Sequence, residues 1–137
     1  MASKKKSWVE KRDCGKAPHV TVIDKAFAGI PAGSKLLISS PMEIDAFVRD
    51  IPKGKQVEAA EMRQILAKRH KADATCPVST GIFLRIVTEA ALEEYNGGKQ
   101  LGSVAPFWRI VTPGSTLAKK LSIGSEEFQT IKKLAGE

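Results

Sequence analysis

The most reactive side chain in this sequence is a cysteine thiol at the start of a predicted helix. Cys76 directly precedes Pro77, where the free backbone N–H groups and the dipole of the helix would activate a thiol as a nucleophile. The sequence places no histidine beside Cys76 to act as a base. We therefore favour a half-buried cysteine that precedes a helix, and keep an enzyme that accepts an alkyl group on Cys76 as the alternative.

The other residue types predict no metal or cofactor site. Cys14 and Cys76 are too few for a disulfide framework, and their separation is unlike that of zinc ligands. Two reduced thiols are expected, with neither a metal nor a cofactor.

The segment from Pro106 to Val111 combines two bulky aromatic residues with an arginine. Phe107 and Trp108 follow the proline, and Arg109 precedes two aliphatic residues. Pro106, Phe107, Trp108 and Arg109 could line a pocket for a planar base, whereas aromatic rings beside a proline are more often part of a core. Both interpretations are carried forward.

The composition favours one domain and a polyanionic partner. The chain has 137 residues, 42% of them hydrophobic, which is enough for one core. Its 22 Lys and Arg residues exceed its 15 Asp and Glu residues, which gives a formal net charge of +7. Because Lys and Arg release counterions from phosphate backbones, this excess is typical of nucleic-acid-binding proteins, although a basic surface that only aids solubility would have the same charge.

The sequence also predicts a location. No apolar run approaches the roughly 20 residues that a membrane helix requires. The lysines at positions 4–6 are not followed by an apolar region, so no secretory signal is expected. We expect a cytoplasmic monomer with no membrane partner.

The chain divides into an arm, a short strand region and a main domain. Residues 1–18 are predicted to be a flexible basic N-terminal arm, with one helical turn where Ser7 and Glu10 have the spacing of a capping box. Residues 19–40 hold two short strands, which are expected to pack on the core as a small sheet layer. Residues 41–137 form the main domain, and the predicted fold class is α+β.

Caps and apolar periodicity predict three successive helices in the main domain. The first begins at Ser40, with Pro41 in the first helical position and Glu43 three residues after the cap. The second spans residues 58–71 and gathers basic residues at its C-terminal end. The third runs from Pro77 to about residue 95, where an Asn-Gly-Gly run stops it.

The second and third of these helices, joined by a short turn, have the arrangement of a helix-turn-helix. Apolar residues gather on one side of the third helix, whereas Gly81, Arg85 and Thr88 lie on the opposite side. A face with little bulk, a hydroxyl and an arginine suits a helix that enters the major groove of DNA. An ordinary solvated helix face would have the same residue types.

A hairpin is predicted to follow as the wing of a winged helix-turn-helix. Trp108–Val111 and Thr116–Leu117 are its two strands, and the Pro113-Gly114 pair between them suits a type II turn. A final helix capped by Ser125 closes the core. The predicted domain therefore has three to four helices and a β wing.

Four short motifs in this chain resemble those of the methylated-DNA-protein cysteine methyltransferase family, in the same order. They are Ile-Pro-Lys-Gly-Lys from Ile51 to Lys55, Thr80 with Gly81, Pro106 with Arg109, Ile110 and Val111, and the ending from Gly124 through Leu134 to Gly136. The similarity spans about residues 41–137. It implies a winged helix-turn-helix that binds duplex DNA.

The reactive cysteine of that family has no counterpart here. In the family, a cysteine thiolate takes an alkyl group from a flipped guanine, and Phe107 stands at that position, with Trp108 in place of the neighbouring histidine. The chain is in this respect similar to alkyltransferase-like proteins, which keep the DNA-binding fold without the cysteine and mark lesions for another repair pathway. The family's base-flipping tyrosine and arginine align with Ala59 and near Val78.

The leading hypothesis is a non-enzymatic protein that binds double-stranded DNA and senses alkylated bases in DNA repair, with a repair protein as a further partner. The predicted DNA contacts are Lys68, Arg69, Lys71, Thr75, Ser79, Thr80, Gly81, Arg85, Thr88, Lys119 and Lys120. Pro106, Phe107, Trp108 and Arg109 would line the pocket for the base. The alternatives are a general winged-helix DNA-binding or regulatory protein, a protein-interaction module that no longer binds DNA, and the enzyme that uses Cys76.

Overall fold

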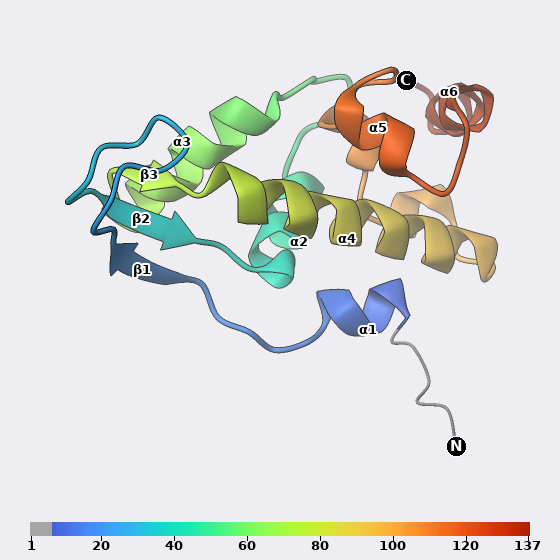
Figure 1. The fold of residues 1–137 in the computed structure, drawn as a ribbon. Coiled ribbons are helices and arrows are strands. Elements are labelled where there is room, and N and C mark those ends of the chain that lie inside the picture. Colours follow the sequence, from blue (N-terminus) through green and yellow to red (C-terminus); the bar gives the residue numbers. More distant parts are fainter. Residues whose placement is uncertain (1–6) are drawn as a thin grey trace.

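The structure is a computed structural model that describes residues 7–137, which form six α-helices and a three-stranded sheet at one end of the molecule (Figure 1). The elements in chain order are α1 (Trp8–Arg12), β1 (His19–Val22), β2 (Lys35–Ile38), α2 (Pro41–Arg49), α3 (Ala59–Arg69), β3 (Ala74–Thr75), α4 (Pro77–Asn96), the 3-10 turns η1 (Leu101–Ser103) and η2 (Phe107–Arg109), α5 (Thr116–Lys120) and α6 (Ser125–Leu134). The predicted α+β class is confirmed.

Helix α4 runs through the middle of the molecule and supplies much of its core (Figure 1). Residues 87–92 are all buried, so this segment of the helix is covered on every side. Helices α1 and α2 and turn η2 pack against it. The first half differs, because Val78, Gly81 and Ile82 are exposed there.

The starts of several helices follow the caps that the sequence predicts. The Ser40 hydroxyl accepts a hydrogen bond from the Glu43 N–H group at 3.1 Å, and Ser7 and Glu10 form a reciprocal capping box. The predicted cap at Ser125 is wrong. A glycine occupies the capping position of α6, and Ser125 is the first helical residue.

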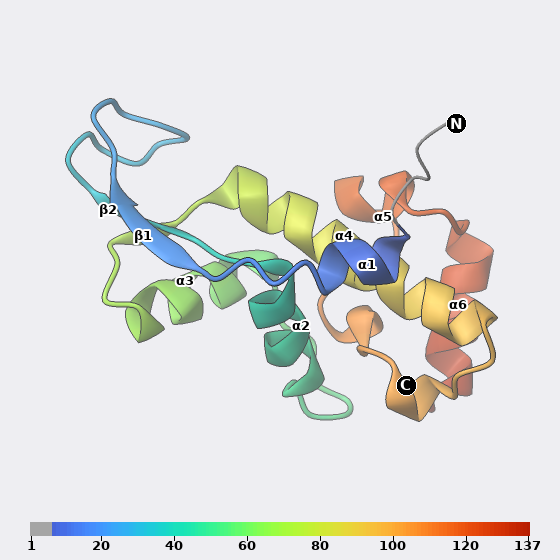
Figure 2. The ribbon, with the colours of Figure 1, turned by 90° about the horizontal axis from the view of Figure 1, so that it is seen from below.

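The sheet has the order β1-β2-β3, and its central strand is the one that packs on the core. Strand β1 runs antiparallel to β2, with His19 opposite Ile38, and β3 runs parallel to β2, with Ala74 opposite Leu36. Leu36 and Leu37 of β2 are buried, whereas all four residues of β1 are exposed. The predicted packing of both strands on the core is therefore right for β2 and wrong for β1. Figure 2 shows the loop between β1 and β2 extending away from the helices.

The hairpin predicted for residues 108–117 is absent, because turn η2 and helix α5 occupy this part of the chain. The turn itself forms, with the Ser115 N–H group donating to the Thr112 carbonyl at 3.1 Å and Gly114 at a φ of 82°. The Ser115 hydroxyl then accepts a hydrogen bond from the Ala118 N–H group and starts a helix in place of a second strand. No β wing follows α4 in the described part of the chain.

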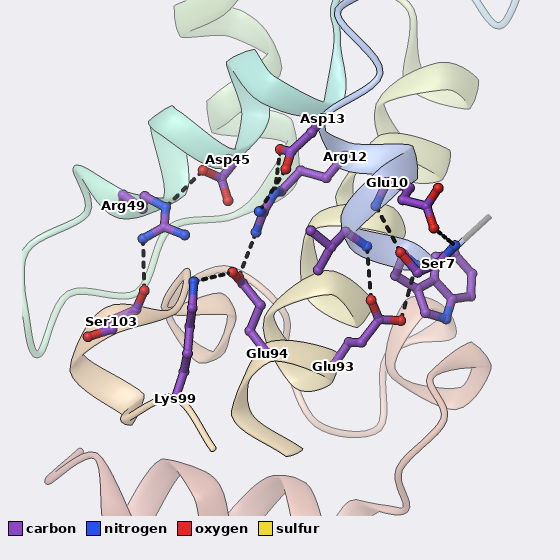
Figure 3. Close-up of polar contacts among 12 residues, drawn as sticks. Ser7, Glu10, Arg12, Asp13, Asp45, Arg49, Glu93, Glu94, Lys99 and Ser103 are labelled. Atoms are coloured by element: carbon purple, nitrogen blue, oxygen red, sulfur yellow. Dashed lines mark hydrogen bonds and ion pairs between the residues drawn. The ribbon is translucent and has the colours of Figure 1, made fainter. Parts of the chain in front are cut away.

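Helix α1 is held against α4 by two neighbouring glutamates of that helix (Figure 3). The carboxylate of Glu93 accepts hydrogen bonds from the main-chain N–H groups of Trp8 and Val9 at 3.1 and 3.3 Å. Arg12 donates to Glu94 at 2.6 Å, and both of these side chains are nearly buried. The carboxylate of Glu93 thus occupies the positive end of α1, where an anion is stabilising.

The same contacts correct the prediction of a flexible arm. From Trp8 to Arg12 the arm is a docked helix, while residues 1–6 lie outside the described residues. Although burial raises the pKa of Glu94, its hydrogen bonds with Arg12 and Lys99 outweigh burial and hold that pKa below its ordinary value. Glu94 therefore remains an anion and keeps its bond to α1.

Replacing Glu93 with alanine should release α1 from α4. The N–H groups of Trp8 and Val9 would lose their acceptor, so amide hydrogen exchange in residues 8–12 should accelerate by about tenfold while the middle of α4 stays protected. The control is Glu127→Ala, which removes an exposed carboxylate from α6. Unchanged exchange in residues 8–12 of the Glu93 variant would contradict this account of the docking.

Candidate nucleic-acid interface

Helices α3 and α4 are joined by a connection that is fixed to the sheet. Strand β3 lies in this connection and pairs with β2. On either side of β3, the N–H groups of Asp73 and Cys76 donate to the carbonyls of Lys35 and Leu37 at 2.8 and 2.9 Å. These bonds fix where α4 begins, so the face that its first two turns present is determined by the sheet.

Three hydroxyl groups predicted to contact DNA are used inside the fold. Thr75, Thr80 and Thr88 are 5%, 2% and 0% exposed, and their hydroxyls donate to main-chain carbonyls at 2.7, 2.6 and 2.8 Å. The two helical threonines bond to the carbonyl four residues earlier, as threonine often does in a helix. The predicted DNA contacts of these three residues are wrong, because packing buries Thr75 on β3 and the sides of α4 on which Thr80 and Thr88 lie.

An open groove of about 600 Å³ lies along the first half of α4. Helices α1 and α5 lie on either side of the middle of α4 (Figure 1), and residues of both contribute to the lining of the groove. The lining residues come from these three helices and are Trp8, Lys11, Pro77, Val78, Gly81, Ile82, Arg85, Ile86, Thr116, Leu117 and Lys120. Three predicted DNA contacts, Gly81, Arg85 and Lys120, are thus brought together, and no carboxylate is among the described residues that line the groove.

The groove combines apolar surface with cationic side chains. Val78 and Ile82, one helical turn apart, are 56% and 55% exposed. The Lys11 ammonium lies 4.3 Å from the centroid of the Trp8 ring, and the Arg85 guanidinium carbon lies 5.4 Å from it. The Nε atom of Arg85 is buried with no hydrogen-bond partner among the described residues. Such a groove could hold an anionic ligand that also has an apolar or planar part.

A second basic region lies at the end of α3. Lys68, Arg69 and Lys71 are exposed there, where the sequence predicts phosphate contacts. Lys68 lines a cavity of about 450 Å³ together with Arg63 and Pro77. Because Pro77 also lines the groove on α4, this cavity and the groove both reach the start of that helix.

The two remaining predicted contacts, Lys119 and Ser79, also lie outside the groove. Lys119 is exposed on α5 but belongs to a different cavity, between α5 and α6. The hydroxyl of Ser79 is buried and has no hydrogen-bond partner in the described part of the chain. Neither residue adds a group to the groove lining.

The aromatic residues of the Pro106–Val111 segment belong to the core. Phe107 and Trp108 are 1% and 2% exposed. The Phe107 ring packs edge to face against Trp108, with centroids 5.2 Å apart, and against Phe128 at 5.4 Å. Phe107 therefore fills a place in the core, and its predicted place in a base pocket is wrong. Pro106, Trp108 and Arg109 do line a neighbouring cavity of about 430 Å³.

Arg109 and Trp108 are joined to a glutamate that sequence reasoning missed. The Arg109 guanidinium and the Trp108 indole N–H group donate to the Glu137 carboxylate, at 2.9 and 2.6 Å. Arg109 also donates to the Ile51 carbonyl at 2.8 Å, and the Gly54 N–H group donates to Glu137 at 3.0 Å. This network ties the last residue of the chain to the loop after α2. A single glutamate beyond a helix gives no signal of such a role in the sequence.

The protonation of Glu137 follows from the same network. Burial of the carboxylate raises its pKa, but the hydrogen bonds from Arg109, Trp108 and Gly54 outweigh burial and lower the pKa to about 2. Glu137 is therefore an anion at every pH at which the protein would ordinarily be studied.

The geometry gives little support to Cys76 as a nucleophile. Its side chain is 6% exposed, in the capping position of α4. The two histidines of the chain are elsewhere, since His70 is hydrogen-bonded to Glu43 at 2.6 Å and His19 lies on β1. A buried thiol without a neighbouring base matches the interpretation that the sequence favours, a cysteine that precedes a helix.

Comparisons with protein-family models, curated proteins and solved structures found no match to this chain. In residues 7–137, no helix is long and apolar enough to cross a membrane. The same residues contain no group of three or more His, Cys, Asp or Glu side chains that could hold a metal ion.

Phe107→Cys should not produce an alkyl-accepting protein. The new thiol would be buried beside Phe128, and loss of the ring should lower the free energy of unfolding by roughly 3 kcal/mol because a cavity remains. Phe107→Leu, which keeps most of the volume, should cost about 1 kcal/mol. Urea unfolding measures both costs, and intact-mass analysis after incubation with alkylated DNA detects transfer. An added alkyl mass on the cysteine variant would show that position 107 reaches a ligand.

Glu137→Gln should make the stability of the protein less dependent on pH under acidic conditions. Because the folded pKa of Glu137 is depressed, its contribution is complete above the ordinary value of 4.5 and is lost as the pH falls toward about 2. The difference in unfolding free energy between wild type and Glu137→Gln should therefore shrink across this range. Glu127→Gln, on the exposed face of α6, is the control. A difference that stays constant across the range would contradict the network.

Proposed function

We propose that this chain is a non-enzymatic protein that binds double-stranded DNA. The observation that carries the proposal is the groove on the first half of α4, whose described lining holds Lys11, Arg85 and Lys120 and no carboxylate. A duplex would lie across this half of the helix. Lys68 and Lys71, at the other side of its start, would extend the phosphate contacts.

Elementary properties of the chain support this assignment. The formal net charge of +7 favours a polyanion, and release of counterions from phosphates supplies most of the affinity in such complexes. In a helix-turn-helix, the first residues of the second helix contact base edges. The exposed first turns of α4, with Gly81 leaving room for close approach, suit that role.

The resemblance to the methylated-DNA-protein cysteine methyltransferases favours the same function. The resemblance to alkyltransferase-like proteins, which lack the acceptor cysteine, extends the proposal to the sensing of alkylated bases in DNA repair. Because Phe107 is buried, the base would have to enter the cavity beside Pro106, Trp108 and Arg109. Tighter binding to an alkylated duplex than to the same plain duplex would support this extension, and equal binding would leave a general DNA-binding or regulatory protein.

A protein-interaction module is a second candidate function. Val78 and Ile82 are more than half exposed on one face of α4, and exposed apolar side chains in a groove are typical of protein-docking surfaces. The two candidates differ in salt dependence, because phosphate binding weakens steeply as salt increases and burial of apolar surface does not.

Arg85→Ala should weaken duplex binding by about tenfold at low salt. If Arg85 contacts a phosphate, the slope of log affinity against log salt concentration should also become shallower by about 0.9. Fluorescence anisotropy of a labelled duplex at several salt concentrations measures both quantities. Lys133→Ala, which removes an exposed cation from α6, should change the affinity much less. An affinity that does not respond to salt, or to loss of Arg85, would contradict the proposed function.

A further inference from the structure

Gly81 occupies a position at which neither the backbone nor the packing requires a glycine. It lies inside α4 without a positive φ, and a Cβ atom added there would meet no heavy atom within 4 Å. A glycine inside a helix lowers stability relative to alanine. Because Gly81 has no side chain, open space remains at this position of the groove.

Two side chains beside this space have unfilled interactions. The buried Nε atom of Arg85 is a hydrogen-bond donor without an acceptor in the described part of the chain. The half-buried ring of Trp8 lines the groove, and its backbone is fixed there because its N–H group donates to Glu93. The exposed Lys11 ammonium and the Arg85 guanidinium both lie over this ring, so a planar ligand that stacks on the ring would take the place of Lys11. The groove therefore offers an aromatic ring and cationic side chains.

We propose that this groove binds one unpaired nucleotide of a DNA strand, an inference that rests on the proposed function. The base stacks on Trp8 over the space at Gly81, the terminal N–H groups of the Arg85 guanidinium donate to an oxygen of the nucleotide, and Lys11 and Lys120 hold the phosphates. An unpaired base has both of its faces free to stack on Trp8, whereas the faces of paired bases inside a duplex are covered by the neighbouring base pairs.

An acidic peptide would form ion pairs with the same cations. The Trp8 ring and the open space at Gly81 therefore distinguish a nucleotide from a peptide as the ligand. A flat base uses both the indole surface of Trp8 and the space that Gly81 leaves, and it accepts a hydrogen bond from Arg85. The carboxylates of a peptide need neither the ring nor the space. The geometry therefore favours a nucleotide.

The test compares a blunt duplex with the same duplex extended by a single-stranded oligothymidine tail. Anisotropy should show that the wild type binds the tailed DNA about tenfold more tightly, with quenching of the fluorescence of Trp8. Trp8→Phe keeps an aromatic ring and should retain most of this preference, whereas Trp8→Leu should lose it. The quenching should be absent from the Trp8→Phe variant, in which the buried Trp108 is the remaining tryptophan.

The Trp8→Leu substitution could also release α1 from α4, which would remove the preference for another reason. A second pair of variants therefore leaves α1 unchanged. Gly81→Leu fills the floor without a clash and should abolish the preference for the tail, whereas Ala46→Leu on the exposed face of α2 should keep it. Equal affinity for both DNAs with unchanged Trp8 fluorescence would overturn the inference and leave the proposed function intact. Retention of the preference in both Trp8→Leu and Gly81→Leu would also overturn it.

Two further results would overturn the inference in ways that bear on the proposed function. If neither DNA binds at low salt, the proposed function fails together with it. If an acidic amphipathic peptide quenches Trp8 and the DNAs do not, the groove is a protein-docking surface.

Discussion

The structure depends on helix α4, which is buried on every side over residues 87–92 and open on one face over its first half. The buried segment forces polar groups to find partners inside the fold, so that Thr88 bonds to the Leu84 carbonyl and Glu89, which is 3% exposed, accepts hydrogen bonds from Ser122. The open half has no such constraint. Its start is fixed by the sheet and its sides are bounded by α1 and α5, and this combination produces the groove.

The positions of the carboxylates explain why this groove is cationic. Glu93 and Glu94 lie further along α4. Glu93 accepts a hydrogen bond from the main chain of α1, and Glu94 accepts one from Arg12. Glu137 accepts a hydrogen bond from Arg109. These acidic groups therefore hold α1 and Glu137 in place and do not neutralise Arg85. The Pro106–Val111 segment likewise serves the core and the Glu137 network, so the structure separates the features that stabilise the fold from the groove that is available for a ligand.

Local sequence signals predicted most of the helices well, but they did not predict which elements pack or pair with one another. Helix α2 follows its serine cap, α4 begins at a proline, and all three of α2, α3 and α4 follow apolar periodicity, and these signals act within a few residues of each other. The burial of Thr88 depends instead on which elements pack against α4, and the short strand β3 depends on its pairing with β2. The prediction of a β wing was wrong because the Ser115 cap starts a helix. This cap is a local signal, but the Pro-Gly turn before it favoured a hairpin in the sequence interpretation. Glu137 was missed because its partners are distant in sequence.

The most direct test of the central claim, that nucleic acid binds the open half of α4, is amide chemical-shift mapping by NMR during titration with a short duplex. The account predicts that the largest shifts occur at Gly81, Ile82 and Arg85 and in α5, and that they diminish as salt is added. Shifts confined to the cavity beside Pro106 and Arg109, or no shifts at low salt, would contradict it.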